Sequence, residues 1–182
     1  MKATGIVRRI DDLGRVVIPK EIRRTLRLRE GTPLEIFTDR EGEIILKKYS
    51  PMMELATFAM QYAEAMAQST GLLVCITDRD QVIAVAGGAK KDLLQRNISR
   101  QLEQAINERS TVLAGKDEKS FIPLVDEDME GVTAQVVTPI ICEGDAIGAV
   151  ALMSRELRAK FGDMETKLAA TAAGFLGRQM EG

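Results

Sequence analysis

The chain of 182 residues is 45% hydrophobic and 29% charged, a balance that excludes a wholly disordered protein. It has no histidine, and its two cysteines, Cys75 and Cys142, are far apart in the sequence, which excludes histidine-dependent catalysis and a four-ligand zinc site. No apolar run approaches the roughly 20 residues of a spanning helix, and the first ten residues lack the apolar core of a signal peptide, so we expect a cytoplasmic protein without cofactor or metal.

Positive charge is concentrated at the start of the chain. Residues 1–50 carry 12 Lys and Arg against 8 Asp and Glu, whereas residues 51–182 carry 13 against 19. Seven of the nine basic side chains in the first 29 residues are arginine, which suits bidentate contacts with phosphate and guanine. This asymmetry indicates a nucleic-acid-binding segment joined to an acidic remainder, with a solvated charged surface as the alternative.

The first fifty residues are predicted to form short strands and one helix. Runs rich in β-formers predict strands at 4–10, 15–18, 34–38 and 43–49, with turns at 11–14 and 39–42. Pro19 ends the second strand and opens a helix over 20–28, with Ile22 and Leu26 on its buried face. So short a module, without cysteine or histidine, buries too little core to fold alone, and we therefore expect an obligate dimer.

The basic residues of the predicted helix share one face, because they recur at i, i+3, i+4 and i+7. Arg15 begins the strand that leads into this helix, and Arg8 and Arg9 lie near the end of the first strand. The predicted DNA-binding residues are Arg8, Arg9, Arg15, Lys20, Arg23, Arg24 and Arg27. A two-fold dimer doubles this charge and favours duplex DNA as the partner, with an affinity that falls steeply with salt.

Four segments carry a resemblance to a known family: TGIVRRID at 4–11, LGRVVIP at 13–19, EIRRTL at 21–26 and EIILKKY at 43–49. Together they resemble the AbrB-type swapped-hairpin transcription regulators of spore-forming bacteria. The resemblance covers residues 1–50 and implies two chains that interleave their hairpins into one β-barrel. It also implies DNA contacts from Arg8, Arg15, Arg23 and Arg24, a basic position at Arg9, readout of DNA shape, and a role in sporulation.

After Pro51 the pattern changes to longer elements. It predicts helices at 52–68, 92–108 and 158–179, strands at 72–77 and 81–86, a loop-rich stretch at 111–131, and a hairpin of strands 132–141 and 146–153. Two helical seams are predicted to join chains: Met52, Ala56, Ala59, Ala63 and Met66 in the first helix, and Met164, Leu168, Thr171 and Phe175 in the last. The element order and length resemble a GAF domain, an antiparallel sheet with flanking helices.

We therefore predict an α+β protein with a swapped-hairpin DNA-binding domain at 1–50, a linker entering a helix at 51–55, and a GAF-like sensor and oligomerisation domain at 56–182. The expected assembly is a homotetramer: a dimer through residues 1–50, paired again through the C-terminal helices. The second domain is also expected to offer a site for an unidentified small molecule.

The favoured function is a DNA-binding transcription regulator, activator or repressor, with no catalytic residue. An antitoxin of a toxin–antitoxin module is the alternative, because the same swapped hairpin occurs there, although with short disordered tails. An enzyme acting through Cys75 or Cys142 is a third hypothesis, weakened by the position of Cys75 inside an apolar strand. The acidic run at 126–130 is interpreted as a solvated loop.

Overall fold

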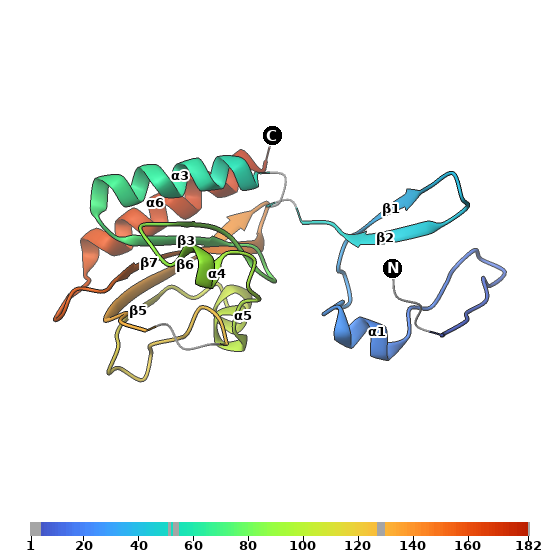
Figure 1. Ribbon diagram of the computed structural model, residues 1–182, viewed down its shortest axis with the longest axis horizontal. Helices are drawn as coiled ribbons and strands as arrows, with labels where there is room; N and C mark the ends of the chain where they lie inside the picture. Colours follow the sequence, from blue (N-terminus) through green and yellow to red (C-terminus); the bar gives the residue numbers. More distant parts are fainter. Residues whose placement is uncertain (1–4, 51, 53–54, 127–129, 182) are drawn as a thin grey trace. The chain divides into compact units, whose positions relative to one another are not determined.

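The computed structural model describes residues 5–50, 52, 55–126 and 130–181. The chain divides into two compact units, residues 1–49 and 50–182. Both units combine helix with antiparallel strands (Figure 1), so the predicted α+β class is confirmed.

The first unit contains one short helix and one hairpin. Strands β1 (Leu34–Thr38) and β2 (Ile44–Lys48) pair antiparallel, with Leu34 opposite Lys48, which confirms the predicted hairpin. Helix α1 (Lys20–Thr25) is shorter than predicted. The backbone N–H of Leu28 donates to the carbonyl of Arg23 at 2.7 Å, and Arg27 has a φ of 51°, so the chain leaves the helix at this point.

The strands predicted at 4–10 and 15–18 are absent from the described residues 5–18, which form a long loop folded back at its tip (Figure 1). A strand needs a neighbour to complete its hydrogen-bond ladder, and within the described chain no strand pairs with this loop. The predicted buried face of α1 is also uncovered, since Leu26 is 55% exposed.

The second unit is built on a five-stranded antiparallel sheet with the order β4-β3-β7-β6-β5. Its strands are β3 (Leu73–Thr77), β4 (Val82–Ala86), β5 (Val112–Gly115), β6 (Ala134–Cys142) and β7 (Asp145–Ser154). Its helices are α3 (Ala56–Thr70), α4 (Lys90–Leu93), α5 (Arg100–Asn107) and α6 (Asp163–Gln179). The two predicted strands before residue 90 and the later hairpin are confirmed.

Both faces of this sheet are covered. Helices α3 and α6 lie side by side on one face, and α4 and α5 lie on the other (Figure 1). A hydrophobic core lies on each face of the sheet, and alternate residues of β3 and β7 point into the two cores. Ile76 and Leu152 face α3 and α6, whereas Leu73 and Met153 face the opposite layer. Full burial of each such aliphatic side chain is worth about 1.5–3 kcal/mol, so this unit has the core that the first unit lacks.

The helix predicted at 92–108 is wrong in its first half. Helix α4 ends at Leu93, after which Leu94 is extended and Gln95 takes a φ of 63°. The backbone N–H of Gln95 then donates to the carbonyl of Val82 at 2.8 Å, so this segment pairs with the start of β4 instead of continuing a helix. A new helix begins after Ser99, whose hydroxyl caps α5 by accepting from the N–H of Leu102 at 3.0 Å.

Two further boundaries differ from the prediction. The stretch 111–131, predicted as loop, contains the edge strand β5. Helix α6 begins at Asp163, five residues later than predicted, because Arg158 has a φ of 67° and interrupts any earlier helical turn. Of the acidic run, residues 127–129 lie outside the described residues.

Three of the five residues in the predicted seam of the first long helix face the core of their own unit. Met52, Ala59 and Ala63 are fully buried in the core of their own unit, against the sheet. The small residues of this seam therefore allow close packing of α3 on its own sheet. Among the described residues, no helix is long and apolar enough to cross a membrane.

Candidate nucleic-acid interface

Arg15 is held by the turn at the tip of the first loop. The carboxylate of Asp11 accepts from the backbone N–H groups of Leu13 at 3.0 Å and Arg15 at 2.7 Å, and it also pairs with the Nε of Arg15 at 2.7 Å. The bonds from the backbone and the side chain of Arg15 lower the pKa of Asp11 below its usual value. Asp11 therefore organises the turn that presents Arg15, a role that the sequence pattern did not reveal.

Helix α1 carries three of the predicted DNA-binding residues on its short surface. Pro19 is buried and precedes the first turn, which fixes where the helix begins. The Nε of Arg23 donates to the carbonyl of Ile18 at 3.1 Å, so its guanidinium is tied to the loop before the helix. The exposed side chains of Lys20 and Arg24 have no hydrogen bond or ion pair with another described residue, and they are available to a ligand.

The other predicted DNA-binding residues, Arg8, Arg9 and Arg27, differ in how exposed they are. Arg8 and Arg9 are exposed on the loop, and a guanidinium nitrogen of Arg8 donates to the carbonyl of Val7 at 3.1 Å. Arg27 lies beyond the end of α1 in a left-handed conformation and is half-buried, so the predicted i+7 position on the helix face is wrong. The structure therefore leaves Arg8, Arg9, Arg15, Lys20, Arg23 and Arg24 exposed within one unit.

The first unit also exposes apolar side chains that a stable monomer would bury. Val7 is 83% exposed and Val17 is 70% exposed. Ten further large apolar residues of this unit are exposed: Ile6, Ile10, Leu13, Val16, Leu26, Ile36, Phe37, Ile44, Leu46 and Tyr49. Apolar surface on this scale marks an interaction site, and part of it lies on the loop at 5–18, with which no strand of the described residues pairs.

The pKa values of both cysteine thiols are raised. Cys75 is fully buried in β3, and burial raises the pKa of its thiol to about 12, so almost none of the reactive thiolate forms near neutral pH. Cys142 is half-buried at the end of β6, and burial together with the nearby carboxylates of Glu143, Glu181 and Asp145 raises the pKa of its thiol.

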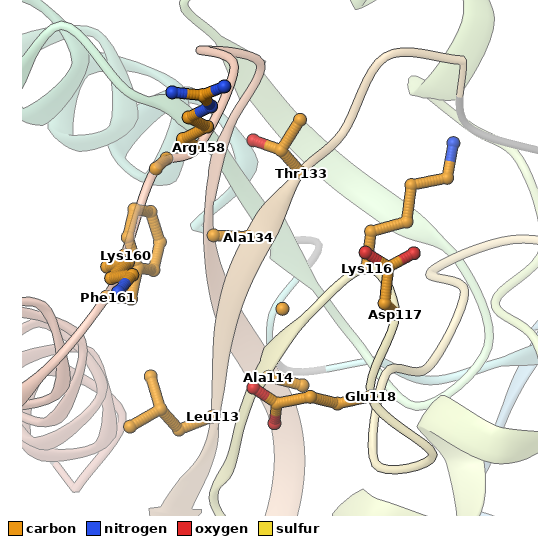
Figure 2. A pocket seen from close by; sticks show the side chains of 12 residues that line it. Leu113, Ala114, Lys116, Asp117, Glu118, Thr133, Ala134, Arg158, Lys160 and Phe161 are labelled. Atoms are coloured by element: carbon orange, nitrogen blue, oxygen red, sulfur yellow. The ribbon is translucent and has the colours of Figure 1, made fainter.

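A hollow of about 690 Å³ lies at the edge of the sheet, between β5, the start of β6 and the segment before α6. Figure 2 shows apolar side chains on one side, from Leu113 and Phe161, and charged side chains around the rim. The charged lining residues are Lys116, Asp117, Glu118, Arg158 and Lys160. The volume is in the range of small-molecule sites, and the mixture of charges suits a polar ligand.

These observations define a class: a regulator with an AbrB-type DNA-binding module and a GAF-like α+β domain. Residues 54–181 match the family model "Stage V sporulation protein T C-terminal, transcription factor", and residues 7–53 match that of "Antidote-toxin recognition MazE, bacterial antitoxin". Stage V sporulation protein T of Bacillus subtilis (strain 168) is 58% identical over 183 residues, covering 100% of this chain and 99% of that protein. The chain therefore belongs to the stage V sporulation protein T family and is a sporulation transcription factor.

Partial relatives support each unit separately. The transition state regulatory protein AbrB of the same organism is 64% identical over 53 residues, which are 29% of this chain and 54% of that protein. The GAF domain of the nutrient sensor CodY from Clostridium difficile has a TM-score of 0.51 at 16% identity and covers 66% of this chain and 83% of that one. At this identity the likeness shows the fold alone, and it confirms the predicted GAF-like domain.

The two competing hypotheses are less supported. The full-length relative is a sporulation protein, and residues 50–182 form a compact unit where an antitoxin would carry a short disordered tail. A free methionine-R-sulfoxide reductase from Thermoplasma acidophilum shares the GAF-like fold, with a TM-score of 0.57 at 13% identity over 71% of this chain and 94% of that one. That likeness carries no activity to this chain, whose family is one of transcription factors.

Proposed function

We propose that the loop tip around Arg15 and the surface of α1 together form the DNA-contacting face of this transcription factor. The observation that carries this proposal is that Arg24 and Lys20 are exposed and uncommitted on α1, while Asp11 holds Arg15 at an ordered turn. Arg8, Arg9, Arg23 and Arg27 add charge around them. Phosphate and base contacts by such arginines are what duplex recognition requires.

The active form of this face is a dimer. The apolar side chains exposed on the first unit lie partly on the loop at 5–18, which belongs to no sheet of the described chain, and together they supply a surface that a second copy would cover. An interleaved barrel of two chains uses both features at once, as the AbrB-type resemblance implies. It also brings two sets of arginines onto one duplex.

Replacing Arg24 or Arg15 by alanine tests the proposed face. Each substitution should weaken binding to a duplex by about tenfold or more, and it should reduce the dependence of the affinity on salt by roughly one counterion per lost phosphate contact. Fluorescence anisotropy over a series of salt concentrations measures both. Arg100→Ala, at an exposed arginine of the second unit, is the matched control and should leave both quantities unchanged.

We also propose that the outer surface of α3 and α6 joins two dimers into a tetramer. The rings of Phe58, Tyr62 and Phe175 gather there, with centroids 5.3 to 6.4 Å apart. Phe175 is 38% exposed, and Met164 and Leu168 lie on the same side of α6. Half-exposed aromatic clusters of this kind are typical anchors of protein interfaces.

The substitution Phe175→Glu tests the second interface. It places a charge in the aromatic cluster, and native mass spectrometry of the full chain should then report a dimer where the parent protein gives a tetramer. Ala170→Glu, at an exposed position of the same helix, should remain a tetramer. A tetramer for Phe175→Glu would show that this surface is not the interface.

The second unit is further proposed to bind a small molecule. The resemblance in fold to the cofactor-binding GAF domain of CodY supports this proposal. The hollow beside β5 is one place for such a ligand. If the native mass spectrum of the parent protein shows a mass above that of the chains alone, the difference would support a bound ligand and give the mass of that ligand. A DNA-contacting face and a ligand-binding second unit fit a transcription regulator that acts in the cytoplasm.

A further inference from the structure

The peptide that joins the two units is anchored on both of its sides. The backbone N–H of Tyr49 donates to the carbonyl of Pro33 within the first unit at 3.0 Å. The hydroxyl of the next residue, Ser50, donates to the Oδ2 of Asp78 within the second unit at 2.9 Å. Met52 is then fully buried in the core of that second unit. Of the predicted linker at 51–55, residues 51, 53 and 54 lie outside the described residues.

Asp78 is an unusual residue for this position. It is only 4% exposed, and among the described residues it has no ion pair, although an unpaired buried carboxylate is costly. Its Oδ1 accepts from the N–H groups of Asp80 and Gln81, both at 2.7 Å, which is enough to hold the turn between β3 and β4. The bond from Oδ2 to Ser50 is not needed for that turn.

The backbone beneath Asp78 is closely packed. Thr77 ends β3, an interior strand of the sheet that pairs with β4 on one side and with β7 on the other. In β7, Gly148 packs so closely on the Thr77–Asp78 backbone that an added Cβ would lie 3.2 Å from the Cα of Asp78 and would overlap the carbonyl of Thr77. Oδ2 of Asp78 is thus a fixed point to which Ser50 is attached.

We propose that Asp78 is a positioning residue for DNA binding, which acts through Ser50 to restrict the motion of the chain between the DNA-binding module and the second unit. This proposal rests on the proposed tetramer. When one assembly places two DNA-binding modules on the same duplex, the second contact is made at an effective concentration that falls as the connection becomes looser. The Ser50–Asp78 bond therefore raises the affinity for a long duplex and leaves the affinity for a short one unchanged.

The test compares Ser50→Ala with the parent protein on two duplexes, one of about 20 base pairs that accommodates a single module and one of about 60 base pairs that accommodates two. We expect Ser50→Ala to bind the short duplex like the parent and the long duplex about 3- to 10-fold more weakly. Ser50→Thr, which keeps the hydroxyl, should restore the affinity for the long duplex. Asp78→Asn should also bind like the parent, because its amide can donate to the Ser50 hydroxyl while Oδ1 still holds the turn.

Ser69→Ala is the matched control, since the hydroxyl of Ser69 donates to the carbonyl of Met66 within its own helix end. It should bind both duplexes like the parent. An equal ratio of long-duplex to short-duplex affinity in Ser50→Ala and the parent would overturn the proposal, as would an equal loss on both duplexes. A parent protein that gains nothing from the longer duplex would instead refute the two-module premise, and with it the proposal, while leaving the arginine face standing.

Discussion

Replacing Val17 by aspartate should abolish tight duplex binding, with a loss of at least about 100-fold. In the single chain this side chain is 70% exposed, and a substitution at a solvated site changes the free energy of unfolding by only about 0.5 kcal/mol. If a partner chain covers it, the substitution buries an unpaired carboxylate twice in each dimer, at a cost of several kcal/mol. A Val17 that stays exposed and a Val17 that a partner chain covers therefore predict affinities for DNA that differ by orders of magnitude in the Val17→Asp protein.

Native mass spectrometry distinguishes the loss of the interface at Val17 from a general loss of folding. The Val17→Asp chain should still pair through the outer surface of α3 and α6, and so give a dimer. Phe175→Glu should give a dimer through the other contact, and the two substitutions together should give a monomer. Val17→Ile, which keeps the site apolar, should bind DNA normally. A tetramer of Val17→Asp with undiminished affinity would refute the covered interface.

The comparison of sequence with structure is most informative in the first unit. The alternating apolar residues at 4–10 and 15–18 predict strands, yet the described single chain has none there. Val7 and Val17 remain exposed in the single chain, and in the proposed dimer this apolar pattern would form a surface that a second copy covers. The need for a partner, inferred from the deficit of core in fifty residues, stays a prediction, whereas the strands that the local pattern predicts at 4–10 and 15–18 are absent from the described residues.

In the second unit, periodicity located the hairpin of β6 and β7 and the last helix, because long apolar runs determine these elements. It missed the break at residues 94–99, which depends on a backbone bond from Gln95 to Val82 in another element. It also missed Asp78 and Ser50, which are 28 residues apart and ordinary in sequence. Contacts of this kind depend on the tertiary arrangement, and no short sequence motif predicts them.

Gly148→Ala should be strongly destabilising, by about 3 kcal/mol, which corresponds to a fall of roughly 10 °C in the melting temperature of the second unit. A single methyl group is ordinarily tolerated or even favourable in place of a strand glycine. Here it would overlap the carbonyl of Thr77, and backbone in the centre of a sheet cannot move aside as a flexible side chain can. Gly174→Ala is the control, because no described atom beyond its chain neighbours and the nearby backbone of its own helix lies within 4 Å of the added Cβ. The change should stabilise α6 by about 0.5–1 kcal/mol.

Thermal unfolding followed by circular dichroism measures both variants. Equal melting temperatures for Gly148→Ala and the parent would mean that β3 and β7 are less closely packed than the structure has them. If the Gly148→Ala chain is destabilised but still folds, a second effect is expected. The substitution would displace the Thr77–Asp78 backbone, and with it the Asp78 side chain whose Oδ2 accepts the hydrogen bond from Ser50. Its affinity for a long duplex should then fall toward that of Ser50→Ala, because the close packing of two central strands is what keeps the anchor of the DNA-binding module in place.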